Sequence, residues 1–156
     1  MSRGRGTRRQ GRELALKIIY WMKSSEDDLQ AVLNDFWSNF RFRNDALGEP
    51  ADDAPVNEDA RLFAEGLVRG VHAHLAEIDQ LVSRCSSNWS IDRMARVDLA
   101  LLRLGAYELL HCPDVPTSVA INEAVEIGKR YGTSETAPFI NGILDRIARE
   151  KRPAQN

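Results

Sequence analysis

The chain has 156 residues, of which 43% are hydrophobic and 28% charged, and its formal net charge is −2 at pH 7. This is the composition of an ordinary soluble protein, with enough residues for one domain or two small packed halves. It has no apolar run of the ~18 residues that a membrane span needs, no apolar segment typical of a secretory signal and only two cysteines, in no CxxC spacing, so we expect a cytoplasmic protein with reduced thiols.

The small net charge hides a strongly basic N-terminus. The first twelve residues contain no acid and five arginines: Arg3, Arg5, Arg8, Arg9 and Arg12. The rest of the chain has 16 basic residues against 23 acidic ones. Clustered guanidinium groups bind phosphate backbones, and cations at the start of a helix oppose its dipole, so a bound anion is expected here. A solubilising or disordered basic tail stays open as the alternative.

Hydrophobic residues recur at helical spacing through the first half of the chain. The stripes predict three helices, at residues 14–22, 29–40 and 60–85. The third is expected to bend near Gly70. Gly66 and Gly70, four residues apart, can let another helix approach closely. Between the second and third helices, Gly48–Pro55 has the composition of an acidic surface loop. The role of the wider segment 44–58 stays undefined.

A polar stretch, Ser86–Ser90, separates this half from the next. Three further helices are predicted, at residues 91–110, 117–131 and 138–147. The first of them is the most apolar, so we expect it to be central and buried on most sides. Two prolines in the segment 111–116 end it, Thr117 or Ser118 is expected to cap the next helix, and residues 151–156 form a polar tail.

No stretch of the sequence alternates as a strand would. We therefore predict an all-α fold of about seven helices in two packed helical bundles. The N-terminal bundle comprises residues 1–86 and the C-terminal bundle residues 87–156, with a seam near Ser86–Ser90.

Residues suited to catalysis, or to a metal or cofactor, are scarce. His72 and His74 lie two apart, so on a helix they face different directions and cannot chelate one metal ion together. The pair His111–Cys112 is no better placed. Gly128–Lys129 lacks the glycine five residues earlier that a phosphate-binding loop needs. We therefore predict no catalytic residue, no metal site and no cofactor.

Several blocks of the sequence form a specific set. They are Arg8–Ala15, Leu102–Leu109, Asp114–Pro116, Ala120–Glu126, Lys129, Tyr131–Gly132 and Phe139–Asp145. Together, and in this order, they resemble the NusB family of bacterial transcription antitermination factors. The resemblance covers about residues 7 to 150, and it is weakest at residues 35–58, where an insertion in a loop is expected.

The resemblance implies an all-α protein of two helical bundles that acts as a single RNA-binding domain, with no cofactor and no turnover. Members of this family pair with NusE, a protein of the small ribosomal subunit. The pair binds single-stranded boxA RNA in transcripts of ribosomal-RNA operons and joins other Nus factors on RNA polymerase. Some members self-associate, so a homodimer stays open.

The resemblance also assigns site residues. The expected RNA-binding residues are Arg5, Arg8, Arg9, Arg12, Tyr20, Lys129, Glu135 and Phe139. Gln10 stands where the family often has a further arginine, so one phosphate contact is expected to be missing. Tyr20 and its neighbour Trp21 can stack unpaired bases, although a place in the core or against a partner stays open for each.

Two further assignments concern the partner and the fold. Asp98 matches an acidic position that faces NusE, and complementary charge suits a basic ribosomal protein. The signature residues of the family are Asn122, Glu123, Asn141 and Asp145. They are interpreted as structural groups that anchor the turn between the last two helices.

A second class of function stays open. A NusB-like domain also precedes the catalytic part of some ribosomal-RNA cytosine methyltransferases. As a fragment of such an enzyme, the chain would be an RNA-binding accessory domain. The 156 residues hold no cofactor-binding βαβ region, and the complete reading frame would decide.

Overall fold

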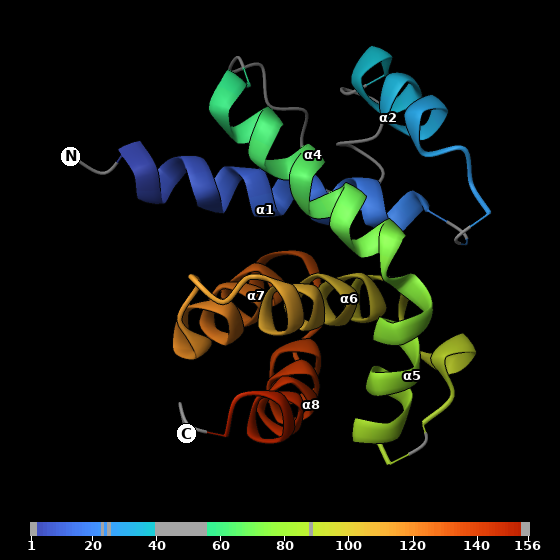
Figure 1. The fold of residues 1–156 in the computed structure, drawn as a ribbon, viewed down its shortest axis with the longest axis vertical. Coiled ribbons are helices and arrows are strands. Elements are labelled where there is room, and N and C mark those ends of the chain that lie inside the picture. The colour runs from blue at the N-terminus through green and yellow to red at the C-terminus, as the bar shows by residue number, and fades with distance from the viewer. Residues whose placement is uncertain (1–2, 23, 25, 40–55, 88, 154–156) are drawn as a thin grey trace. The chain divides into compact units, whose positions relative to one another are not determined.

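The structure is a computed structural model that describes residues 3–22, 24, 26–39, 56–87 and 89–153. Within these ranges it has seven α-helices, one short 3-10 helix and no strand (Figure 1). Their bounds are α1 Arg3–Trp21, α2 Leu29–Ser38, α4 Glu58–Ala73, α5 Leu75–Cys85, η1 Ile91–Arg93, α6 Arg96–His111, α7 Thr117–Tyr131 and α8 Thr136–Lys151. The all-α prediction is confirmed. None of these helices is both long and apolar enough to cross a membrane. The expected loop at Gly48–Pro55 lies outside the described residues.

The chain forms two compact units, residues 1–73 and 74–156. Helices α1, α2 and α4 belong to the first unit, and α5 to α8 belong to the second. The division falls after Ala73, whereas the sequence placed a seam at Ser86–Ser90. The long third helix expected from the sequence is in fact two helices, because His74, with φ −116° and ψ 22°, ends the run before Leu75 starts α5.

In the first unit, α1 packs against α4, the blue and green helices of Figure 1. The buried apolar residues of α1 are Leu14, Ala15, Leu16, Ile18 and Ile19, and Met22, directly after the helix, is buried as well. The two helices come closest at Gly11, where a Cβ atom would lie 2.6 Å from Cδ2 of Phe63. Gly66 was expected to permit such an approach, but no atom lies within 4 Å of the place its Cβ would take. The close approach is therefore made at Gly11 instead.

Polar contacts of Trp37 and a hydrogen bond from Arg69 to Gln30 at 3.0 Å join α2 to α4. The indole N–H of Trp37 donates to Oε2 of Glu65 at 2.7 Å, and the guanidinium of Arg61 lies 4.7 Å from the centroid of the Trp37 ring. The helix begins at Asp28, whose Oδ1 accepts the backbone N–H of Ala31 at 3.2 Å. Such a cap satisfies a donor that the first turn would otherwise leave unpaired.

Helix α6 is the centre of the second unit, because α5, α7 and α8 all pack on it. Every residue from Ala100 to Ala106 is buried, which confirms the expectation of a central helix. Its start was predicted too early. Met94 and Ala95 have extended backbones, with ψ of 144° and 142°, so α6 begins at Arg96 and the residues before them form η1.

One buried ion pair joins α6 to α5. Arg103, 8% exposed, donates from Nε to Oδ1 of Asp79 at 2.9 Å and from Nη2 to Oδ2 at 2.8 Å. A two-point contact of this kind fixes both position and orientation. The Asp79 carboxylate compensates the positive charge of Arg103, which would otherwise be costly to bury among the apolar residues of α6.

The C-terminal end of α6 is capped by Arg152, which the sequence placed in a polar tail. The side chain is 7% exposed. Its guanidinium donates at 2.6–3.0 Å to the carbonyl oxygens of Glu108, Leu109, Cys112 and Val115. It also donates to the hydroxyl of Thr117 at 3.3 Å. Thr117 therefore accepts from Arg152, and α7 starts after Pro116 with no side-chain cap from either Thr117 or Ser118. Both parts of the sequence prediction, the tail and the cap, were wrong here.

Candidate nucleic-acid interface

The arginines of the N-terminus lie on α1, and the structure separates them by exposure. Side chains are described from Gly6 onward, so Arg5 is placed only by its backbone, in the first turns of the helix. Arg8 is exposed and Arg9 half-buried. Arg12 is only 3% exposed. Of the three arginines with described side chains, Arg8 and Arg9 can meet a ligand from solvent as they stand, whereas Arg12 belongs to the packing of the unit.

A phenylalanine of α4 supports these side chains. The guanidinium carbons of Arg8 and Arg12 each lie 5.4 Å from the centroid of the Phe63 ring. A cation at that distance is attracted to the ring quadrupole. Phe63 reaches this position because Gly11, between the two arginines, leaves room for it. The basic face of α1 is thus held in place by an aromatic ring that the sequence assigned only to a hydrophobic stripe.

Tyr20 lies near the other end of the same helix. At 1.5 Å per residue, the twelve residues between Arg8 and Tyr20 span roughly 18 Å along the axis. Its ring is half-buried and stands edge-on to that of Trp21, with centroids 5.5 Å apart. A ligand that touched both Arg8 and Tyr20 would have to be an extended chain rather than one nucleotide.

The remaining RNA-binding residues predicted from the sequence lie in the second unit, at the end where α7 stops and α8 begins. Lys129 is exposed in the last turn of α7, and its Nζ lies 2.8 Å from Oε2 of Glu126. Glu135 is exposed at the N-cap of α8, and Phe139 is half-buried in the first turn. The structure therefore brings Lys129, Glu135 and Phe139 to one end of this unit.

An exposed tryptophan joins this group. Trp89, in the turn between α5 and η1, is 53% exposed, and its ring centroid lies 6.3 Å from that of Phe139 at an angle of 67°. Exposed aromatic rings provide surfaces on which unpaired bases stack. Sequence reasoning missed Trp89 because it lies in a polar stretch with no periodic pattern. The only available signal was a large aromatic residue in a segment of serines.

Asp98 anchors the turn between α7 and α8. Its Oδ1 accepts the hydroxyl of Thr136 at 2.7 Å, and the Thr136 oxygen accepts the backbone N–H of Thr133 at 3.0 Å. Thr136 is 1% exposed, whereas Asp98 is half-buried. One oxygen of the carboxylate is therefore engaged within the unit, and Oδ2 accepts no hydrogen bond from the residues described.

Three of the family's four signature residues, Asn122, Asn141 and Asp145, do not anchor that turn as expected. Asn122 and Asn141 are exposed, and their side chains make no hydrogen bond to any described residue. With Asp145 they line an open pocket of about 580 Å³ beside Pro116 and Ile121. Asp145 pairs with Arg149 on its own helix at 2.9 Å. The polar groups that do hold the turn are those of Asp98 and Thr136.

Comparisons with known proteins identify the family and the fold. Residues 9–149 match the model of the NusB family. The transcription antitermination protein NusB of Syntrophotalea carbinolica is 61% identical over 150 residues, which are 95% of this chain and 96% of that protein. The solved structure of Thermotoga maritima NusB, titled "T. maritima NusB", superposes with a TM-score of 0.72 at 36% identity, over 94% of each chain. A chain in a structure titled "Crystal Structure of a Plectonemic RNA Supercoil" is 26% identical, with a TM-score of 0.69 over 92% of this chain and 95% of that one.

Proposed function

The chain belongs to the NusB family of transcription antitermination proteins, and from this premise we propose that it binds boxA RNA together with NusE. The family membership makes it a transcription antitermination factor and not an enzyme. In the proposal, the pair captures the boxA element in transcripts of ribosomal-RNA operons. It then joins other Nus factors on RNA polymerase in the cytoplasm.

The observation that carries the RNA proposal is the exposed basic face of α1. Arg8 and Arg9 supply positive charge that reaches solvent, and Arg8 is steadied by Phe63. We assign these two arginines to phosphate contacts, because guanidinium groups match the geometry of phosphate oxygens. Arg12, 3% exposed, is assigned a supporting role beside the Phe63 ring. Arg5, one helical turn before Arg9, is assigned to the same basic face.

Phosphate contacts carry no sequence information, so base recognition is assigned to other residues. Tyr20 in the first unit, and Phe139 with Trp89 in the second, offer aromatic rings for stacking. The Glu135 carboxylate can only accept hydrogen bonds, so it reads amino groups of bases or ribose hydroxyls. Lys129 supplies a further positive charge at the same end of the unit as Glu135.

The NusE contact is assigned to Asp98. Its carboxylate is half-buried and keeps one oxygen that no described residue engages. A ribosomal protein is basic, and an acidic group at the interface speeds the encounter and fixes its orientation. The bond from Thr136 holds this carboxylate in one position before the partner arrives.

The experiment that tests the RNA proposal is a titration of labelled RNA, read by fluorescence anisotropy, over a series of salt concentrations. Each phosphate contact to a single strand contributes about 0.7 to the slope of log affinity against log salt. The double substitution Arg8→Ala, Arg9→Ala should therefore flatten the slope by about 1.4 and weaken boxA and scrambled RNA alike.

Arg149→Ala is the matched control, because Arg149 is an exposed arginine that already pairs with Asp145. It should leave both the affinity and the slope unchanged. If the double variant binds both RNAs as tightly as the wild type, α1 does not hold the phosphates.

Two alternatives have distinct outcomes. If the chain were the accessory domain of a methyltransferase, it would bind ribosomal RNA without any response to NusE. If it were only a structural homodimer, light scattering would show a dimer that NusE does not dissociate. The 61% identity to a transcription antitermination protein supports the antitermination proposal over the methyltransferase alternative.

A further inference from the structure

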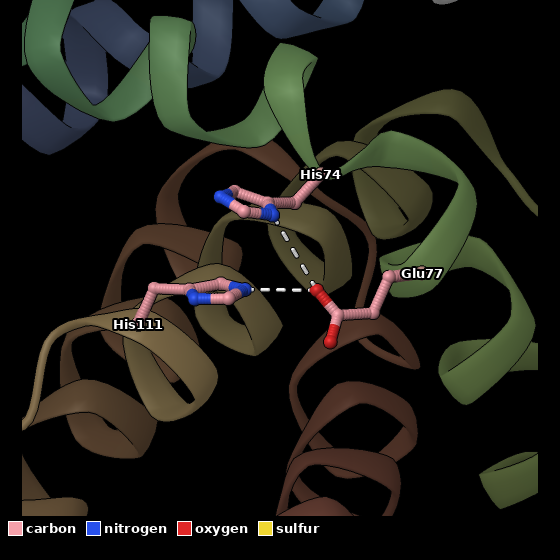
Figure 2. Close-up of side chains that lie close together, drawn as sticks. All are labelled: His74, Glu77 and His111. Carbon is pink, nitrogen blue, oxygen red and sulfur yellow. Dashed lines mark hydrogen bonds and ion pairs between the residues drawn. The ribbon is translucent and has the colours of Figure 1, made fainter.

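We propose that His74, Glu77 and His111 form a binding site for a divalent transition-metal ion of the Zn²⁺ type. His74 precedes α5, Glu77 lies in its first turn, and His111 is the last residue of α6. Figure 2 shows the two imidazole rings and the carboxylate directed toward one another. The site lies wholly within the second unit and serves no step of the RNA proposal.

The distances suit a metal with short bonds. Nδ1 of His74 lies 3.5 Å from Oε1 of Glu77, and Nε2 of His111 lies 2.8 Å from the same oxygen. One ligand atom from each residue falls within 4.8 Å of the other two. Zinc bonds nitrogen and oxygen at about 2.0–2.2 Å, so two of its tetrahedral ligands lie roughly 3.3–3.5 Å apart. The first pair already has this spacing, and the second needs to open by about half an ångström. The stacked imidazole rings must also turn so that one nitrogen of each points at the ion.

The arrangement was invisible to the sequence because its members come from different helices. His74 was compared with His72, two residues away, and His111 with Cys112. In the fold His74 and His111 stack on each other, with ring centroids 3.8 Å apart and 22° between the planes. The carboxylate of Glu77 lies beside that stack, where it contacts one nitrogen of each ring (Figure 2).

The donor set selects the class of ion. Two imidazoles and one carboxylate suit zinc and its neighbours in the first transition series, whereas Ca²⁺ and Mg²⁺ favour oxygen ligands alone. The side chains of His74, Glu77 and His111 are 41%, 53% and 28% exposed, so an ion can enter and keep water as its fourth ligand.

The nearby thiol is not part of the set. Cys112, the residue after His111, is not in the group of described side chains whose ligand atoms lie within 4.8 Å of one another. The ligands are therefore His74, Glu77 and His111, and the neighbouring thiol of Cys112 contributes none. A bound ion would link the start of α5 to the end of α6 and raise the melting temperature of the protein.

The test is a calorimetric titration of tag-free, EDTA-treated protein with ZnCl₂. A parallel titration with CoCl₂ is followed by visible absorption spectroscopy. We expect one equivalent of Zn²⁺ to bind and the melting temperature to rise. His74→Ala, Glu77→Gln and His111→Ala should each lower the affinity by more than ~10-fold, in line with the cost of disturbing a metal site. Glu77→Gln keeps the size of an exposed side chain, and circular dichroism checks that each variant is folded.

Two control variants make the result specific. The chain has three histidines, and His72→Gln removes the one outside the cluster, so it should bind Zn²⁺ as the wild type does. Cys112→Ser should do the same, and the Co²⁺ spectrum should lack the charge-transfer band of a cobalt–thiolate bond. The proposal is overturned if the wild type binds no Zn²⁺ at ~100 μM, because a dedicated metal site binds zinc at lower concentrations. It is equally overturned if the three cluster variants bind normally or if Cys112→Ser alone abolishes binding.

Discussion

The indole ring of Trp89 stands edge-on to the phenyl ring of Phe139, with centroids 6.3 Å apart and 67° between the planes. The pair joins the turn after α5 to the first turn of α8. It forms an aromatic surface at the end of the second unit where Lys129 and Glu135 also lie. Because Trp89 is 53% exposed, about half of the residue is open to a ligand.

Replacing this tryptophan should weaken RNA binding more than it weakens the fold. Trp89→Ala removes a stacking surface, and a stacked base contributes about 1–3 kcal/mol by alanine substitution. We expect a loss of that size for boxA RNA, measured by anisotropy, and a partial recovery in Trp89→Phe. Leu62→Ala is the control, since Leu62 is a 59% exposed apolar residue outside the proposed interface. Equal affinities for Trp89→Ala and wild type would remove Trp89 from the interface.

The close approach of α1 and α4 gives a matched pair of glycine variants. In Gly11→Ala the new methyl would meet Cδ2 of Phe63 at 2.6 Å, and overpacking of this kind costs about 1–3 kcal/mol. In Gly66→Ala the methyl meets no atom within 4 Å, so the better helix propensity of alanine should stabilise the protein by about 0.5–1 kcal/mol. Urea denaturation measures both free energies of unfolding. Because Phe63 supports Arg8, we also expect Gly11→Ala to weaken RNA binding. A stabilised Gly11→Ala protein together with a destabilised Gly66→Ala protein would contradict the packing described.

The cap on α6 should dominate the stability of the second unit. Arg152→Ala removes a donor from five acceptors, four of them main-chain carbonyls. The carbonyls of Glu108 and Cys112 keep a backbone N–H donor, whereas a buried acceptor left with no donor costs about 1–3 kcal/mol, so we expect a loss of at least that size. Arg149→Ala, three residues earlier, removes only a surface ion pair from a side chain that is 70% exposed, and should cost no more than about 0.5 kcal/mol. Thermal and urea unfolding of the two variants compare them directly, and similar losses would show that Arg152 does not act as a cap.

The proposed NusE contact can be tested by removing only a charge. Asp98→Asn keeps an oxygen that accepts the Thr136 hydroxyl, so the turn before α8 should stay in place. Without the negative charge, association with NusE should slow and depend less on salt. Surface plasmon resonance measures the association rate, and Asp92→Asn, an exposed acid of η1, is the control. An unchanged association rate in Asp98→Asn, with slower association in Asp92→Asn, would show that NusE does not bind at Asp98.

The helices were predictable because the hydrophobic period of 3.6 residues dominates most of the chain. The positions at which the helices end were harder to predict. His74 interrupts a hydrophobic stripe that continues on both sides, and neither proline nor glycine marks the place. The start of α6 was missed for the same reason, since neither proline nor glycine marks the extended backbone at Met94 and Ala95.

The site was predictable only in part. The arginines are conspicuous as a charge cluster, and the family resemblance located Lys129, Glu135 and Phe139. The burial of Arg12 was not predictable, because it depends on the Phe63 ring from another helix. Arg152 gave no periodic signal either. Contacts between elements distant in the sequence, such as the stacked His74 and His111, appear only once the helices have packed.

The most direct measurement is the binding of labelled boxA RNA to the folded protein at low ionic strength, with and without purified NusE. We expect the chain alone to bind weakly, the mixture with NusE to bind more tightly, and both affinities to fall as salt is raised. The Arg8→Ala, Arg9→Ala variant should bind less RNA in the presence of NusE. If the RNA stays free in the mixture while both proteins are folded, the RNA-binding function proposed for this chain is contradicted.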